Sequence, residues 1–245
     1  MTGLLKQASS HLMAGMSESH SLENLFAELD ALSPSGCASS AVCVSGVDPE
    51  QAPEAERAIA KSWAAGRRRE FAAGRLCARS ALKELGIEAK NLIRDAEGLP
   101  MWPREVIGSI SHCRDLCIAV VARGQSYALL GLDVERTDRL SDAAMARVLH
   151  ETEIDWVNAD QVRASLLFSL KEAFFKAQYP RWRTAGNFQD LALAPDLEAG
   201  TVTIQTMDAR FAPELKQLEF GFRLVGAHVL SLCWLTNPPA ARNAP

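Results

Sequence analysis

The chain has 245 residues, of which 48% are hydrophobic and 23% are charged, and its formal net charge at pH 7 is −4. This composition is that of an ordinary globular protein, and the length suffices for one large domain or two small ones. The small negative charge excludes a general polyanion binder, so any phosphate or nucleic-acid site must be a local basic cluster.

The six cysteines are scattered and lie mostly within apolar runs, which predicts reduced, buried thiols rather than a disulfide framework. His112, Cys113 and Cys117 would suggest zinc, but no second ligand pair follows at the required spacing. No stretch approaches the roughly eighteen apolar residues of a membrane span, and the N-terminal runs are too short for a signal peptide. We therefore expect a cytoplasmic protein with no membrane association.

The first half of the chain reads as an early strand, a long helical region and two paired strands. The apolar run 41–44 predicts the early strand. A helical pattern starts at Pro53 and runs to Leu85, with an interruption expected at Gly66 and a stop at Gly86. The paired strands are expected at 106–111 and 116–122.

The second half repeats this order of helices before strands. A strand near 127–135 precedes helices at about 141–158 and 161–179. Three further strands are expected at 201–204, 220–224 and 229–234. Helices followed by strands, twice over, predict an α+β fold of two pseudo-symmetric α/β halves. We divide the chain into halves 1–127 and 128–245, although no letter-level repeat supports the duplication.

Three carboxylates carry the strongest functional signal. Asp133 and Glu135 are two apart at a strand end, so both point to one face. Glu172 would join them if the helix at 161–179 packs over that strand end. Three carboxylates without basic partners repel one another unless a hard cation such as Mg²⁺ joins them. For the strand pair alone, a solvated strand end is the alternative.

A lysine shares a helix face with the third carboxylate. Glu172 and Lys176 are four apart and flank Phe174 and Phe175 in an apolar helix, which favours a groove mouth. The alternative is a surface salt bridge worth only ~0.3–0.5 kcal/mol.

Two serines and a histidine form another candidate group. Ser109 and Ser111 alternate onto one strand face, and His112 follows. Small hydroxyls beside an imidazole could bind a phosphate, although a plain hairpin end would read the same. A Ser-His catalytic pair is disfavoured because adjacent strand residues point apart and no nucleophile elbow is present.

A basic cluster lies on the long helix of the first half. It comprises Arg67, Arg68 and Arg69, with Arg75 and Arg79 farther along. Arginine favours two-pronged contact with phosphate, although a solvated helix face is the alternative. Nucleic-acid binding would need interleaved stacking aromatics, which the run lacks.

Five pieces of the sequence, in order, resemble the 4′-phosphopantetheinyl transferases of the surfactin-synthetase type. The nearest branch is that of the enterobactin-synthetase component and its broad-specificity pseudomonad relatives. The pieces are FAAGRLCAR at 71–79, PMWP at 100–103, GSISH at 108–112, GLDVE at 131–135 and FSLKEAFFK at 168–176. The resemblance covers roughly 57–180.

The resemblance implies a site for coenzyme A (CoA) and Mg²⁺ in the cleft between the halves. Asp133, Glu135 and Glu172 would hold Mg²⁺ against the diphosphate, and Glu172 would also act as general base, directly or through water. The remaining catalytic and CoA-binding candidates are Lys176, His112, Ser111, Lys171, Arg67, Arg75 and Arg79. Many relatives have a lysine where this chain has Leu99. The resemblance therefore does not assign which basic residues bind the nucleotide.

The implied activity is transfer of 4′-phosphopantetheine from CoA to a serine of an apo carrier protein, with release of adenosine 3′,5′-bisphosphate. The expected enzyme is a monomer whose partners are acyl, peptidyl or aryl carriers, in siderophore, other secondary-metabolite or fatty-acid synthesis. A Mg²⁺-dependent nuclease is disfavoured because Arg136 and Thr137 follow Glu135, without the usual lysine. A non-catalytic CoA-binding subunit is the other alternative.

Overall fold

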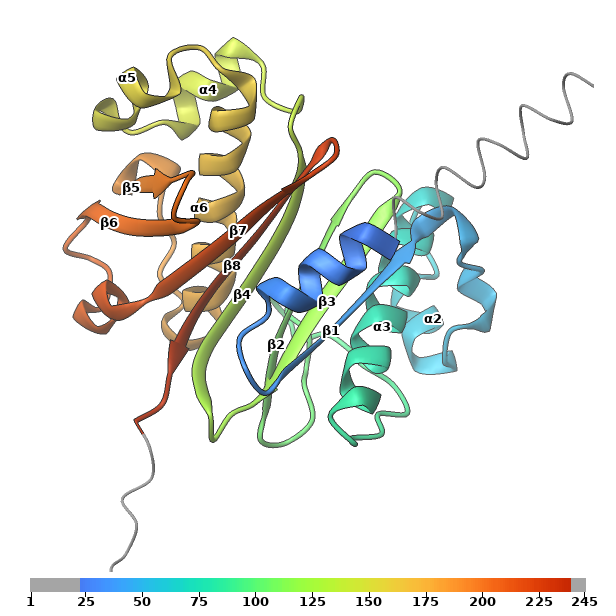
Figure 1. Cartoon of the computed structure of the whole chain (residues 1–245). Helices are drawn as coiled ribbons and strands as arrows, with labels where there is room; N and C mark the ends of the chain where they lie inside the picture. The colour runs from blue at the N-terminus through green and yellow to red at the C-terminus, as the bar shows by residue number, and fades with distance from the viewer. Residues whose placement is uncertain (1–22, 239–245) are drawn as a thin grey trace, which may run out of the picture.

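The computed structural model describes residues 23–238, and its core is two three-stranded sheets flanked by helices (Figure 1). The first sheet has the antiparallel order β1-β3-β2, from Cys37–Cys43, Leu116–Arg123 and Val106–Cys113. Helices α2 (Glu54–Ala60) and α3 (Ala65–Glu84) lie on its outer side. This sheet and its helices form the N-terminal half.

The second sheet has the antiparallel order β4-β8-β7, from Tyr127–Arg136, His228–Thr236 and Glu219–Val225. Helix α6 (Gln161–Trp182) packs on it, together with the hairpin of β5 and β6, and α4 and α5 lie at one end (Figure 1). The bounds of these smaller elements are β5 Leu191–Asp196, β6 Thr201–Met207, α4 Asp142–Val148 and α5 Ile154–Val157. Short 3₁₀ helices are Val44–Gly46, Pro49–Gln51, Glu151–Glu153, Phe188–Asp190 and Pro213–Gln217. The predicted α+β class with two sheet-and-helix halves is confirmed.

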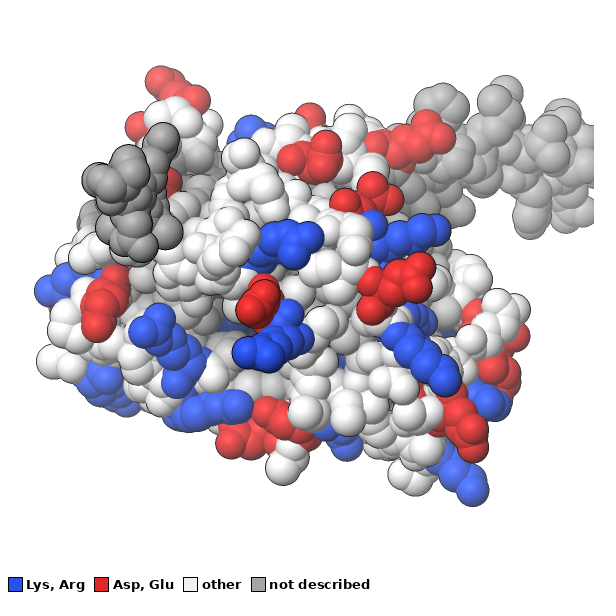
Figure 2. Space-filling view, turned by 90° about the horizontal axis from the view of Figure 1, so that it is seen from below, with Lys and Arg blue, Asp and Glu red and all other residues white. Residues whose placement is uncertain are grey.

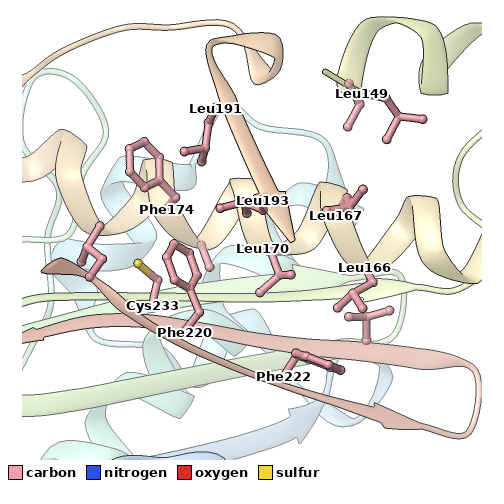
Figure 3. Packing of buried hydrophobic residues seen from close by; sticks show 14 of the residues in the cluster. Leu149, Leu166, Leu167, Leu170, Phe174, Leu191, Leu193, Phe220, Phe222 and Cys233 are labelled. Carbon is pink, nitrogen blue, oxygen red and sulfur yellow. The ribbon is translucent and has the colours of Figure 1, made fainter. Parts of the chain in front are cut away.

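Each half has its own apolar core. In the C-terminal half, Leu166 and Leu170 of α6 face Phe220 and Phe222 of the sheet, and Phe174 lies on the other side of the helix, toward Leu191 of β5 (Figure 3). In the N-terminal half, the small residues Ala73, Cys77 and Ala81 bring α3 close to its sheet. The six cysteines are free, as expected, and four of them are buried.

A third apolar cluster joins the halves. A helix described at 23–32, not expected from the sequence, buries Leu25, Leu29 and Leu32 against residues of both sheets. Its spacing of i, i+4 and i+7 presents these leucines on one face. The end of this helix reaches Gly221 of β7, where an added Cβ would lie 2.7 Å from Leu32 Cδ1.

Most expected elements are present, with some differences at their ends. Residues 61–64 separate α2 from α3, so the expected interruption at Gly66 is wrong. Gly86, with a φ of 72°, follows the end of α3 as predicted. The single helix expected at 141–158 is two short helices, and β5 was not expected. Among residues 23–238, no helix combines the length and hydropathy needed to cross a membrane.

Strands β2 and β4 place the two halves in contact. Each is an edge strand of its own sheet, and the two strands touch along their length. On the other side of β4, Gly131 lets α6 approach, because a Cβ there would lie 2.0 Å from the carbonyl oxygen of Ala173. Elements of both halves therefore meet around Asp133. The division into 1–127 and 128–245 itself stays a prediction.

Candidate active site

Asp133 on β4 is the meeting point of three elements. Its Oδ1 accepts hydrogen bonds from Ser111 Oγ of β2, at 2.8 Å, and from Lys176 Nζ of α6, at 2.6 Å. Lys176 Nζ also donates to Ser111 Oγ, at 2.9 Å. The predicted approach of the α6 helix face to the strand end is thus seen in the structure. The other oxygen, Asp133 Oδ2, is buried without a hydrogen-bond partner in the described chain.

The other two predicted metal ligands lie near this group. Glu135 is buried at the end of β4, and its Oε2 lies 2.6 Å from Arg139 Nε. Burial raises the pKa of Glu172 on α6, nearby Asp133 and Glu135 raise it further, and Lys176 lowers it. Burial also raises the pKa of Glu135. The three carboxylates are therefore close enough to repel one another.

Asp133, Glu135 and Glu172 have the chemistry to bind a hard divalent cation, although their carboxylates are not gathered around one point. Between residues 23 and 238, no three His, Cys, Asp or Glu side chains lie grouped as a metal site. The ion pairs of Asp133 with Lys176 and Glu135 with Arg139 account for this, because each turns one carboxylate toward a cation of the chain. The unpartnered Asp133 Oδ2 and the all-oxygen donor set match the preference of Mg²⁺. Lys176 and Arg139 thus balance the charges of Asp133 and Glu135.

His112 connects this group to the N-terminal half. Its Nε2 lies 3.0 Å from Arg67 Nη1 and 4.0 Å from Glu70 Oε2. Burial is the main cause that lowers its pKa, so the neutral ring is favoured. With Arg67 donating to Nε2, the ring proton is on Nδ1.

An arginine that the sequence analysis did not single out extends the basic cluster. The guanidinium of Arg94 lies 4.7 Å from the centre of the Trp63 ring, and that of Arg67 lies 5.9 Å from the same ring. Arg94 comes just before the turn that contains Leu99. The Trp63 indole contacts both arginines. The sequence carries only a weak signal for this tertiary contact, an arginine beside the turn at Gly98.

Two other arginine candidates have structural partners inside the N-terminal half. Arg75 is buried, donates from Nε to the carbonyl oxygen of Leu92 at 2.7 Å, and has its pKa lowered to about 10 chiefly by burial. Arg79 donates to the buried carboxylate of Glu56, which also accepts from the amide of Leu92 at 2.7 Å. These partners argue against the expected nucleotide contacts, because both guanidiniums are committed to holding the segment around Leu92.

The expected contact of Lys171 with CoA is wrong. Lys171 has no exposed surface, and its Nζ donates to Glu153 Oε2 at 2.6 Å and to the carbonyl oxygen of Val148 at 2.9 Å. Lys171 points around α6 away from Lys176, as helical geometry requires. What it meets there is the interior of its own half rather than a ligand.

A cavity of about 590 Å³ opens beside Lys176. Its walls come from β2, β4, α6 and the turn at 95–102, and they include Trp102, Ile110, Leu129 and Phe175. At the rim, Arg183 bridges the halves by donating to Glu97 at 2.8 Å and to Asp95 at 3.2 Å. The site thus combines an apolar cavity with a charged group at its edge.

The face of the molecule seen in Figure 2 has no continuous patch of one charge sign. In the view from below, lysines and arginines alternate with aspartates and glutamates (Figure 2). This agrees with the expectation that basic groups act locally, at defined positions.

Comparisons with known proteins agree with this arrangement. The family model described as the 4′-phosphopantetheinyl transferase N-terminal domain matches residues 54–122, and that of the 4′-phosphopantetheinyl transferase superfamily matches 129–233. The chain is 38% identical to the 4′-phosphopantetheinyl transferase Svp of Streptomyces mobaraensis over 67% of each chain. It is 31% identical to the 4′-phosphopantetheinyl transferase Npt of Nocardia iowensis, over 71% of this chain and 79% of the relative.

A third relative belongs to the predicted branch. Enterobactin synthase component D of Escherichia coli strain K12 is 40% identical over 46% of this chain and 56% of its own length. The two family models together match strands of both sheets, although β1 lies outside them, and the matched regions contain Ser111, Asp133 and Lys176. The chain belongs to the 4′-phosphopantetheinyl transferase superfamily.

Proposed function

We propose that this protein transfers the 4′-phosphopantetheine arm of CoA to a serine hydroxyl of an apo carrier protein in a Mg²⁺-dependent reaction. The observation that carries the proposal is the junction at Asp133, where β2, β4 and α6 bring a carboxylate, a hydroxyl and an ammonium together. Carboxylates beside a lysine suit a diphosphate, which needs its charge neutralised for transfer. The monomeric state and the cytoplasmic location stay predictions.

The carboxylates Asp133, Glu135 and Glu172 would hold Mg²⁺. When bound, Mg²⁺ supplies positive charge against the CoA diphosphate. Lys176 neutralises the phosphate oxygens from α6, and neutral His112 donates a hydrogen bond from Nδ1. These two side chains come from different halves, so a diphosphate bound between them would touch both.

Glu172 is the proposed general base. It takes the proton from the carrier serine as the serine oxygen bonds to the phosphorus that carries the pantetheine arm. The bond from this phosphorus to the bridging oxygen breaks, and adenosine 3′,5′-bisphosphate leaves. Burial raises the pKa of Glu172, which makes its carboxylate a stronger base than an exposed glutamate.

The remaining groups position the two ends of CoA. The apolar cavity beside Lys176 would take the pantetheine arm, because its walls are mainly apolar and it opens at the charged group. Arg67 and Arg94 on Trp63 would bind the 3′-phosphate, a role suited to the two-pronged geometry of guanidinium.

Mass spectrometry tests the transfer directly. An apo carrier protein incubated with CoA, Mg²⁺ and this protein should gain one phosphopantetheine, and a chelator should abolish the gain. The set should include a fatty-acid carrier and a peptidyl carrier, since their relative rates indicate the natural acceptor. No gain on any of several carriers would refute the proposal.

Glu172→Gln separates catalysis from mere CoA binding. The amide keeps the size of the side chain but is not a base, so turnover should fall by roughly 100-fold. CoA affinity measured by calorimetry should change much less. An unchanged transfer rate would exclude Glu172 as the base, and CoA binding without transfer by the unaltered protein would favour a non-catalytic subunit.

A further inference from the structure

The contact between the two halves lacks the hydrogen-bond ladder of an ordinary sheet. β2 and β4 are edge strands of separate sheets, yet they lie side by side. Edge strands carry backbone N–H and C=O groups that need partners once they are buried. On β4, the residues around Asp133 are buried, so water does not supply these partners.

Serine hydroxyls of β2 take the place of the missing backbone acceptors. The amide of Leu132 donates to Ser109 Oγ at 3.0 Å, and the amide of Val134 donates to Ser111 Oγ at 3.3 Å. Ser109 Oγ also lies 3.5 Å from the carbonyl oxygen of Leu132. Because the residue numbers rise together, the two strands run parallel along this contact. We call Ser109 and Ser111 the hydroxyl ladder.

The hydroxyl ladder accepts hydrogen bonds from β4 on both sides of Asp133. Leu132 precedes Asp133 and Val134 follows it, and each has one serine as its partner. Ser111 also touches the Asp133 carboxylate and Lys176, so it belongs to the charged group itself. Ser109 touches neither, so it reaches Asp133 through the backbone of β4, and it also lies in the wall of the apolar cavity.

We propose that Ser109 is a positioning residue. Its hydroxyl fixes the position of Asp133 on β4 relative to His112 on β2. The inference rests on the proposed function, in which Asp133 and His112 contact one diphosphate from the two halves. Both serines are nearly fully buried, which keeps water from replacing the hydroxyl. A displacement of about 1 Å is enough to slow an aligned reaction by roughly 100-fold.

Replacing Ser109 by Ala leaves the Leu132 amide buried without an acceptor, whereas Thr keeps a hydroxyl there. Ser39→Ala is the matched control, because Ser39 is a buried serine of β1 whose hydroxyl has no partner in the described chain. Each variant is assayed well below its melting temperature, so that loss of fold does not enter the comparison.

Two readouts separate positioning from mere stability. The affinity for Mn²⁺ in the presence of CoA, measured by calorimetry, should fall by roughly tenfold in Ser109→Ala, as for other residues that orient metal ligands. The kcat should fall by roughly tenfold or more, with the KM for carrier unchanged. Ser109→Thr should recover most of both losses, and Ser39→Ala should match the unaltered protein.

Unchanged Mn²⁺ affinity and kcat in folded Ser109→Ala would overturn the positioning role. Equal losses in Ser39→Ala, or no recovery in Ser109→Thr, would also overturn it. The proposed function fails separately, if the unaltered protein transfers nothing from CoA to any carrier.

Discussion

At the scale of single residues, the site depends on side chains from both halves that hydrogen-bond to one ammonium group, that of Lys176. Lys176 serves Asp133 and Ser111 together, and His112 meets Arg67 on the other side. A row of groups thus runs from the carboxylates on β4 to the arginines on Trp63. In the proposed binding mode, the diphosphate of CoA lies at the carboxylate end of this row and the 3′-phosphate at the arginine end. Substitutions can therefore test the two ends separately.

Arg94→Ala tests the nucleotide end of the row. Removing the guanidinium should weaken CoA binding by roughly tenfold, the scale of one charge-assisted contact of ~1.5 kcal/mol. Dephospho-CoA, which lacks the 3′-phosphate, should bind both proteins equally. Calorimetry with the two ligands measures the difference, and Arg104→Ala is the control on an exposed arginine. Equal weakening of both ligands would place the 3′-phosphate elsewhere.

His112 should make stability depend on pH. Its pKa in the folded protein is below its ordinary value because of burial, so the unfolded chain binds more protons below about pH 6.5. The free energy of unfolding should therefore decrease as the pH falls through this range. Urea unfolding should show a smaller decrease for His112→Asn, and His228→Asn, which removes another histidine whose pKa is lowered by burial, gives the comparison. An identical decrease in His112→Asn would assign the effect to other groups.

At the scale of elements, the contact between β4 and α6 sets where Lys176 and Glu172 lie. Gly131 makes this contact possible, since a side chain there would enter the backbone of α6 at Ala173. The helix therefore passes directly over the strand that carries Asp133. A larger residue at this point would move the helix face relative to the carboxylate.

Gly131→Ala should destabilise the protein by about 3 kcal/mol or more, because neither backbone can yield without loss of packing. Gly66→Ala provides the control, as Gly66 lies in the first turn of α3 with open space around it. The control should be neutral or more stable by about 0.5–1 kcal/mol. Chemical denaturation measures both. Equal stability of Gly131→Ala and the unaltered protein would show that α6 can shift freely.

Particular residues show how far the sequence predicts the elements and the site. The alternation in β2 and β4 and the apolar face of α6 are local patterns, so the strands, the helix and the meeting of Asp133 with Lys176 could be predicted. The direction of Lys171 around α6 could be predicted too, but its partner Glu153 lies on another element. β5 carries Pro195 and gives a weak strand pattern. The stacking of Arg94 on Trp63 depends on the tertiary fold alone.

At the scale of the whole molecule, the two halves resemble each other in two ways. They have a similar order of elements, and each contains its own buried ion pair. Glu56 before α3 pairs with Arg79 of α3 and accepts from the amide of Leu92. Glu153 before α6 pairs with Lys171 and accepts from the amide of Leu193 at 2.8 Å. In each half, one carboxylate ties its long helix to the segments before and after it. This correspondence supports the predicted pseudo-symmetry where the sequence letters do not.

Lys171→Met should cost about 3–5 kcal/mol of stability, because it leaves the carboxylate of Glu153 buried without its cation. Arg79→Met should act likewise in the other half. The melting temperatures of both variants, followed by circular dichroism, measure the loss, and Lys61→Met on the surface is the control. A Lys171→Met protein as stable as the control would mean that the backbone amides alone satisfy Glu153.

The helix at 23–32 has a consequence for the order in which the chain folds during synthesis. Its last leucine rests against Gly221, and Glu28 lies 3.4 Å from Arg223, so its docking surface includes β7, which follows it by almost 190 residues. A ribosome releases the N-terminal sheet long before residues 219–225 emerge. The helix is therefore made well before β7, and the part of its apolar face that packs on the second sheet stays unburied until residues 219–225 have emerged.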